Sequence, residues 1–517
     1  MVGIHLITPG GGKAAGLKVM KNNADDPVTT PNTDYGKFLF NSETTDIGYI
    51  NRIASFTYSG IMASSGFYPS GTNASTCQYK VTYYSSSSWL EKEIYFNLNT
   101  LGGASYTFYP LCEWRSKKAN GRYPGPSNKY SVYSSSGSID TGFQLSQVGW
   151  EMGAGAPVST NNSGITYSFF KLMGNASSPY TQNGVLSIWE LPDRNQPLAS
   201  PTGTPVAGQQ NFLFSPTLIK VVRPGFDVAT ATGRQVILDS NRVPAKIIRA
   251  GQVSIAAGAS VTVTTDFALD DTTFVDFNVF AQGYGNAWPS VLGIGPNRDY
   301  SVDFEYAISG NSVILYNSGG YTLDVRYMIC GDSAAGGTTG GNEWWRVVAG
   351  NHWQIKRPGS SDTSPSLSDI LFDSRFSYVP IIAEGYLATA DFTESVPSGE
   401  LKYGERAKTI SFANTGFVPF VKYVVVHQWI PASGSTETRT RAPRSELLTG
   451  YGTSNQWFGR QTNQGTVALI SDTSVKFFVS PSNPFRVNYS GQTVTQPNPK
   501  TPILGIRYYI FGIPTAL

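Results

Sequence analysis

Apolar and polar residues alternate along several short stretches of the chain. Residues 260–267, SVTVTTDF, place apolar side chains at alternate positions, which is typical of a strand with one covered face. The apolar runs EIYFNLN at 93–99 and KYVVVHQWI at 422–430 indicate strands covered more fully. Long runs at helical spacing are missing, and the best short candidate is SELLTGYG at 445–452, where Ser445 is placed to cap a turn or two. The pattern therefore predicts antiparallel β structure.

One short phrase occurs twice. The tripeptide Arg-Pro-Gly at 223–225 precedes VILDS at 236–240, and the same tripeptide at 357–359 precedes ILFDS at 370–374. The prolines lie 134 positions apart (358 minus 224), and this offset also carries Asp239 onto Asp373 without a gap. The later stretches VRYMICG at 325–331 and IRYYIFG at 506–512 match as well. These matches predict a duplicated module.

A weaker copy lies near the N-terminus. LKVMKNN at 17–23 resembles IKVVRPG at 219–225, and FLFNS at 38–42 resembles ILFDS after an insertion of about four residues. We expect an all-β fold of tandem antiparallel β-sandwich-like modules repeated along the chain. The predicted segments are an N-terminal arm (1–16), a divergent first module (17–192), a connector (193–217), a second module (218–331), a glycine-rich connector (332–352) and a third module (353–517).

The repeated phrase has a local structural interpretation. Pro-Gly predicts a turn, and the three apolar residues that follow the polar loop predict a buried strand. The short side chains of Asp and Ser can accept hydrogen bonds from nearby backbone amides. Asp239 and Asp373 are therefore predicted to hold turns, as part of the scaffold, and not to bind a metal or a substrate.

Composition favours an assembled β protein. Hydrophobic residues make up 40% of the 517 and charged residues only 14%, whereas an ordinary soluble domain has about 25% charged residues. The net charge of +3 implies no general attraction to nucleic acid or membrane, and the basic clusters at 115–122 and 439–444 are interpreted as solvated loops. Three cysteines without CxxC spacing favour a reducing place of synthesis. No signal peptide or apolar span is evident, so membrane insertion is not expected.

Residues for catalysis are sparse. The three histidines, His5, His352 and His427, fall in different contexts, and His427 lies in an apolar run where a core or interface role is expected. The sequence lacks HExxH, GxSxG and EF-hand patterns. We therefore predict no enzyme activity, no cofactor and no metal site. The acids at 266–271 and Asp140 leave a polysaccharide depolymerase as an alternative.

Five aromatic residues in loop-like sequence are the candidate contact residues. They lie among Gly, Ser, Asn and Pro, which is typical of adaptable binding loops. Such rings can anchor a subunit interface or hold a sugar ring, and an interface is the favoured interpretation. The five are Tyr284, Trp288, Trp429, Trp457 and Phe458.

The second module, IKVVRPGFDV followed by VILDS and VRYMICG, resembles β-rich modules of tail-tip, baseplate and fibre-associated proteins of tailed bacteriophages. The third module has the same motif with larger loops, and the first only loosely. The resemblance implies a structural component of the virion tail, made in the bacterial cytoplasm, with copies of itself in a symmetric oligomer and neighbouring tail proteins as partners. Alternatives are an adhesin for host-surface glycan, a capsid decoration or neck protein, and the depolymerase.

Overall fold

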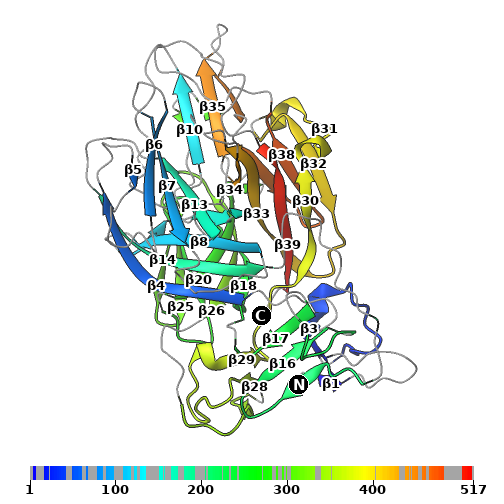
Figure 1. The fold of residues 1–517 in the computed structure, drawn as a ribbon. Helices are drawn as coiled ribbons and strands as arrows, with labels where there is room; N and C mark the ends of the chain where they lie inside the picture. The colour runs from blue at the N-terminus through cyan, green and yellow to red at the C-terminus, as the bar shows by residue number, and fades with distance from the viewer. Residues whose placement is uncertain are drawn as a thin grey trace.

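The computed structural model describes three groups of residues (Figure 1). The first group is 4–6, 17–22 and 24–41. The second consists of the strands between 49 and 191, together with residues 121–122. The third is 204 and 208–514, with gaps at 224, 232–234, 242–243, 271, 282–286, 289–293, 296–297, 300–303, 332–338, 351, 402, 430–436, 442, 444, 452–456, 462–464 and 482–502. Side chains are described for 18–22, 24–41, 121–123 and most of the third group.

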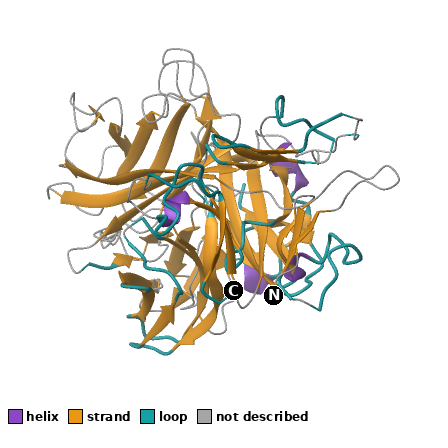
Figure 2. Ribbon diagram, turned by 90° about the horizontal axis from the view of Figure 1, so that it is seen from below, coloured by secondary structure: helices purple, strands orange, loops and turns teal. Residues whose placement is uncertain are grey.

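The described chain consists of strands joined by loops and four short 3₁₀ turns (Figure 2). The turns are η1 (Tyr35–Lys37), η3 (Leu367–Asp369), η4 (Thr389–Asp391) and η5 (Ser398–Glu400). None of the helices in the described residues is long and apolar enough to cross a membrane. The all-β prediction is confirmed.

Three small antiparallel sheets form the lower end of the molecule in Figure 1. Each follows chain order, so that its middle strand pairs with both neighbours. The strands are β1 (Ile4–Leu6), β2 (Leu17–Met20) and β3 (Phe38–Asn41); β15 (Phe212–Phe214), β16 (Ile219–Val222) and β17 (Val236–Asp239); and β27 (Trp345–Val348), β28 (His352–Lys356) and β29 (Ile370–Asp373).

The repeated phrase forms the turn and the last strand of two of these sheets. Gly225 and Gly359 have φ of 87° and 77°, a conformation that favours glycine. Each turn is closed by a backbone hydrogen bond, from the amide of Phe226 to the carbonyl oxygen of Arg223 and from the amide of Ser360 to that of Arg357. Asp239 Oδ1 accepts a hydrogen bond from the amide of Asn241 at 2.9 Å, and Asp373 Oδ1 accepts one from Arg375 at 2.8 Å. The prediction that both aspartates hold turns is confirmed.

Apolar residues of all three small sheets meet in one core. The ring of Phe40 lies 5.8 Å from the ring of Phe372, and Tyr378 covers both. These residues pack together because each short strand has too little apolar surface to form a core of its own. The remaining members are Val19, Leu39, Ile219, Val221, Ile237, Leu238, Ile355 and Leu371.

Pairs of larger sheets follow the second and third small sheets. Val275, Val325 and Leu315 belong to a core shared by the two sheets of one pair, and Val425, Ile506 and Phe477 to a core shared by the two sheets of the other. Burial at alternate positions of strands such as SVILYN (Ser312–Asn317) produces these faces.

The strands of the pair after the second small sheet are β18 (Lys246–Ile255), β20 (Phe274–Ala281) and β26 (Leu323–Gly331) in one sheet, and β19 (Ser260–Thr264), β24 (Phe304–Ser309), β25 (Ser312–Asn317) and β9 (Tyr123–Pro124) in the other. Those of the pair after the third are β30 (Ile381–Ala388), β33 (Phe417–Trp429), β34 (Glu437–Arg441) and β39 (Ile503–Pro514), and β21 (Ala287–Trp288), β31 (Glu394–Ser395), β32 (Arg406–Ser411), β37 (Thr466–Ile470) and β38 (Ser474–Val479).

The strands between 49 and 191 also form two larger sheets, which are described by their pairing. One contains β4 (Tyr49–Gly60), β8 (Tyr109–Lys117), β11 (Glu151–Ala154) and β14 (Tyr180–Leu191). The other contains β5 (Gly66–Phe67), β6 (Gln78–Tyr84), β7 (Trp89–Asn97), β12 (Ala156–Pro157) and β13 (Ile165–Leu172). Two smaller sheets remain, one of β10 (Lys129–Ser134), β35 (Ser445–Tyr451) and β36 (Trp457–Gln461), the other of β22 (Ile294–Gly295) and β23 (Arg298–Asp299).

Two expectations about local structure need correction. The helical candidate at 445–452 is wrong, because 445–451 is strand β35, which is hydrogen-bonded to β10 on one side and β36 on the other. These tertiary hydrogen bonds override the local capping signal. The segments predicted as arm and connectors are not only linkers, since each contains an edge strand of a small sheet, β1, β15 or β27.

Candidate functional site

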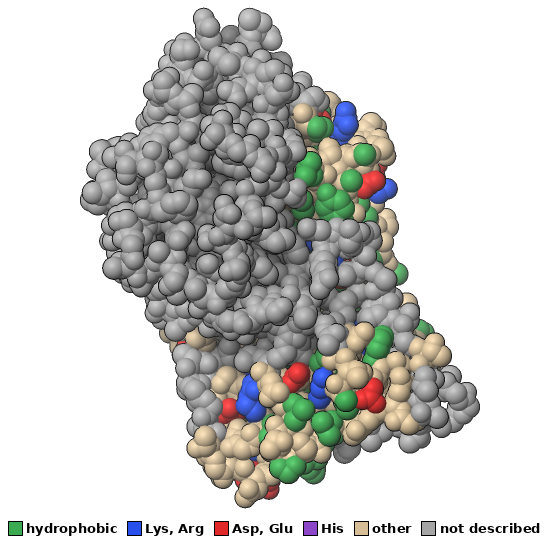
Figure 3. All heavy atoms as spheres, viewed as in Figure 1, with side chains coloured by type: hydrophobic (Ala, Val, Ile, Leu, Met, Phe, Trp, Pro, Cys, Tyr) green, Lys and Arg blue, Asp and Glu red, His purple; other side chains and the backbone are tan. Residues whose placement is uncertain are grey.

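An exposed row of apolar side chains lies along strand β27. Trp345 and Val347 are 52% and 58% exposed, and Trp344, just before the strand, is 39% exposed. The ring of Trp344 lies 5.0 Å from that of Phe214 on β15. We call these four side chains the apolar edge. Hydrophobic side chains also gather on the lower end of the molecule in Figure 3, and exposed apolar side chains grouped in this way are typical of interaction sites.

The apolar edge is exposed because β27 is the outer strand of its sheet. Trp345 lies opposite Ile355, whose side chain is in the shared core. The matching residue of β15 is Phe212, which lies opposite Val221 and packs against the same core. Trp345 is larger than Phe212 and is 52% exposed, whereas Phe212 is partly buried.

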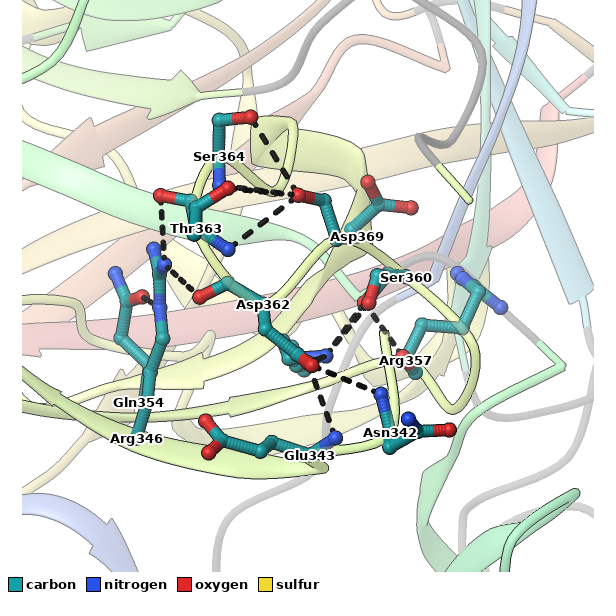
Figure 4. A network of polar contacts seen from close by, with 12 residues as sticks. Asn342, Glu343, Arg346, Gln354, Arg357, Ser360, Asp362, Thr363, Ser364 and Asp369 are labelled. Atoms are coloured by element: carbon teal, nitrogen blue, oxygen red, sulfur yellow. Dashed lines mark hydrogen bonds and ion pairs between the residues drawn. The ribbon is translucent and has the colours of Figure 1, made fainter. Parts of the chain in front are cut away.

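Asp362 anchors the backbone that leads into β27 (Figure 4). Its carboxylate accepts hydrogen bonds from the amides of Asn342 at 2.9 Å and Glu343 at 3.0 Å. A side chain at Gly341 would collide with the carbonyl oxygen of Ser360, so this close approach of two backbone segments requires glycine. The tryptophans are thus held by fixed main chain, which lowers the entropy lost on binding.

Lys356 forms an ion pair with Asp362 from the buried side of the sheet. Its side chain is fully buried, and Nζ lies 2.8 Å from Asp362 Oδ1 and donates a hydrogen bond to the carbonyl oxygen of Ser360 at 2.7 Å. At the matching place after the bulge, the second small sheet has Val222 and the first has Met20. The charged anchor is therefore particular to the third small sheet.

A row of polar side chains crosses the third small sheet beside this anchor. Arg346 donates hydrogen bonds from Nε to Gln354 at 2.9 Å and from Nη1 to the carbonyl oxygen of Asp362 at 3.0 Å. Gln354 in turn donates to the buried carboxylate of Asp373, which also pairs with Arg375. These contacts satisfy the buried polar groups and fix the spacing of β27, β28 and β29.

The hydrogen bond from Lys356, together with the backbone amide of Asn342, lowers the pKa of Asp362 to about 2. Because the folded-state pKa lies below the ordinary value of 3.8, the stabilisation that Asp362 contributes is present above about pH 4 and is lost as the pH falls through about 2. We expect the 19F resonances of 5-fluorotryptophan at Trp344 and Trp345 to stay constant from pH 7 to about pH 3 and to shift below that. The Asp362→Asn protein should lack this low-pH transition. A transition centred near pH 4 in the unmodified protein would contradict the account.

Four of the five aromatic residues predicted as contacts lie on strands, so their backbones are not in loops. Trp288 is on β21, Trp429 at the end of β33, and Trp457 and Phe458 on β36. Their side chains, and Tyr284 altogether, lie outside the described residues. The four belong to three different sheets. Their role as contacts stays a prediction.

Sequence reasoning missed Trp344 and Trp345 because they follow the glycine-rich stretch GDSAAGGTTGGN, which predicts a linker. The signal that could have found them is the run EWWRVV, which has the apolar content of an edge strand and too few flanking apolar residues for a core.

His352, Arg346 and Asp362, which lie near the apolar edge, each make contacts within the scaffold. His352 Nδ1 lies 3.2 Å from Ser374 Oγ, at the start of β28. Among the residues that the structure describes, no group of three or more His, Cys, Asp or Glu is placed to hold a metal ion. What the surface offers to a ligand is flat aromatic area on a rigid main chain.

No protein-family model, curated protein or solved structure matches the chain.

Proposed function

We propose that the chain is built from three copies of one unit, each a small sheet followed by a pair of larger sheets. The small sheets support this, because each carries a bulge at the same place in its middle strand, after Val19, Val221 or Ile355. The same backbone hydrogen bond follows each bulge. Its donors and acceptors are Lys21 and Lys37 at 2.8 Å, Arg223 and Gln235 at 2.8 Å, and Arg357 and Asp369 at 2.7 Å.

The larger sheets support the same proposal. In each pair one sheet contains three long strands in the same relative order: β4-β14-β8, β18-β26-β20 and β30-β39-β33. The other contains β7-β13-β12, β19-β25-β24 and β32-β38-β37. Gly251 and Gly385, which are 134 positions apart, each lie opposite a tyrosine, Tyr327 or Tyr508, whose hydroxyl would be within 3 Å of an added Cβ. Shared contacts of this detail favour duplication.

In the proposed arrangement the three units close into a ring. The short strand β9, which follows β8 of the first unit, pairs with β24 and so extends a sheet of the second unit. Likewise β21, which follows β20, extends the sheet of the third unit at β37. Strand β34, which follows β33, contacts β11, β12 and β13 of the first unit. Each unit thus reaches onto the next, which protects sheet edges that would otherwise be open.

We propose that this chain is a structural component of a tailed-bacteriophage virion, in the distal tail. The observation that carries the proposal is the pairing of β9 with β24 and of β21 with β37, because strands exchanged between sheets from distant parts of the chain suit a rigid assembled part. The distal tail as the location comes from the sequence resemblance. Mass spectrometry of purified virions, followed by immunogold labelling, tests it. We expect the chain in stoichiometric amount at the tail tip, and its absence from virions would overturn the proposal.

The apolar edge is the surface proposed to dock on a neighbouring tail protein. Replacing Trp344 and Trp345 together by alanine should change the free energy of unfolding by about 1 kcal/mol or less, because both side chains are substantially exposed. Incorporation into virions should fall by on the order of tenfold, since interface tryptophans contribute disproportionately to binding. The matched control is Tyr321→Ala, which removes another exposed ring. Equal incorporation of both variants, measured by quantitative mass spectrometry, would contradict this role.

Recognition of host-surface glycan is a second candidate function, favoured by the same two exposed tryptophans on anchored main chain. Flat aromatic faces can hold sugar rings. Binding on a glycan array that disappears in the double alanine variant, with the fold unchanged, would promote this candidate over docking.

A further inference from the structure

Asp276 and Lys422 occupy the same position in two of the proposed units. Asp276 lies opposite Met328 in the β20–β26 pair, and Lys422 lies opposite Tyr509 in the β33–β39 pair. Two residues further along, Asn278 and Val424 lie opposite Arg326 and Arg507. The surrounding residues FVDF at 274–277 and FVKY at 420–423 have the same apolar pattern, with the charge reversed at the third position.

These two matching residues bind each other. Lys422 Nζ lies 2.7 Å from Asp276 Oδ2, and the side chains are 0% and 4% exposed. Asp276 Oδ1 accepts a hydrogen bond from the amide of Phe277 at 2.9 Å. A buried carboxylate and a buried ammonium would each be strongly unfavourable without a partner of opposite charge.

The pair lies inside the interface between the second and third units. The amide of Ile247 donates to the carbonyl oxygen of Ser377 at 2.8 Å, and the amide of Ser377 donates back at 2.9 Å. Arg326 of the second unit pairs with Asp472 of the third. Ala250, Met328 and Cys330 of the second unit belong to the core cluster of the third.

The first unit has an acid at the matching position of its sequence. LCEW at 111–114 aligns with FVDF at 274–277 and FVKY at 420–423, which places Glu113 on β8 in register with Asp276 and Lys422. The side chain of Glu113 lies outside the described residues. At this position the three proposed units therefore carry two acids, Glu113 and Asp276, and one base, Lys422.

We infer that the Asp276–Lys422 pair selects the partner of each unit: the ring closes between unlike units of one chain, and not between like units of several chains. This inference rests on the proposed three-unit arrangement. Three copies of the second unit would bring three aspartates together, and three copies of the third would bring three lysines together. Only a mixed ring places opposite charges at this position, so the surface fits an unlike unit of the same chain and disfavours a second copy.

The test is a charge-reversal series in the full chain: Lys422→Asp, Asp276→Lys and the double exchange. Amide hydrogen exchange of the peptides that contain Ile247 and Ser377 reports whether the second and third units are joined. Light scattering coupled to size exclusion reports association between chains. The matched control is Lys476→Asp, which breaks a partly exposed 2.7 Å pair with Glu400 inside the third unit.

We expect each single reversal to raise exchange at both peptides at least about tenfold and to produce species larger than the unmodified chain. The double exchange should recover most of the protection and the original mass, and the control should change neither. Single reversals without effect, or a double exchange as damaging as the two singles combined, would overturn the inference. Rapid exchange at both peptides in the unmodified protein would instead overturn the three-unit arrangement itself.

Discussion

Replacing Asp373 by alanine is expected to lower the free energy of unfolding by about 3 kcal/mol. Asp373 is fully buried, it pairs with Arg375 Nη2 at 2.7 Å, and it accepts a hydrogen bond from Gln354. Its removal leaves the buried amide of Gln354 and the largely buried guanidinium of Arg375 without their acceptor. The shift of the denaturant midpoint in chemical unfolding measures the loss.

Asp239→Ala is the matched control, because Asp239 holds the corresponding turn of the second small sheet. It is partly exposed and accepts a hydrogen bond from Asn241, so its loss should cost about 1 kcal/mol. Equal effects of the two substitutions would show that the polar row of the third small sheet adds no stability. A ligand or metal that protects either aspartate would contradict their assignment to the scaffold.

Tyr123→Ala is expected to cost about 3 to 4 kcal/mol. Tyr123 is 3% exposed, and its ring stacks on Tyr306 of β24 with centroids 5.0 Å apart. Its neighbour Arg122 lies 3.7 Å from the ring centroid of Tyr316. The residue therefore fastens strand β9 into the core that β24 shares with β20 and β26.

Thermal and chemical unfolding of Tyr123→Ala should be compared with Tyr321→Ala, whose ring is 40% exposed and whose loss should cost about 0.5 kcal/mol or less. If both substitutions have similarly small effects, β9 does not pack against β24 as described.

Much of the strand structure could be predicted from local pattern. Residues 260–264 of SVTVTTDF form strand β19, and residues 422–429 of KYVVVHQWI lie on β33. The Pro-Gly turns and the buried ILF residues also lie as expected, because alternation and turn chemistry are local properties. The repeated phrase also predicts tandem modules. The pairing of β9 with β24 and of β21 with β37 instead brings sheets from distant parts of the chain together, and two-residue strands have no periodicity that would reveal such pairing.

The candidate surface was less predictable than the fold. Trp344 and Trp345 become conspicuous only when β27 is seen as an edge strand, because exposure depends on what the rest of the chain covers. The same limit applies to Lys422, which reads as part of an apolar strand until its partner Asp276 is found 146 positions earlier (422 minus 276). For Trp288 the strand pairing changes the interpretation of a residue that the sequence placed in a loop. Its position on β21, opposite Ala468 of β37, matches that of Tyr123 on β9, opposite Tyr306 of β24, which favours a role in an internal interface.

An experimental structure of the full chain, determined without imposed symmetry, tests the three-unit ring most directly. The account predicts three units related by successive rotations of about 120°, with β9 on β24, β21 on β37, and Lys422 against Asp276 in the interior. Three sandwiches strung along an extended chain, with those strands unpaired and Lys422 facing solvent, would contradict it.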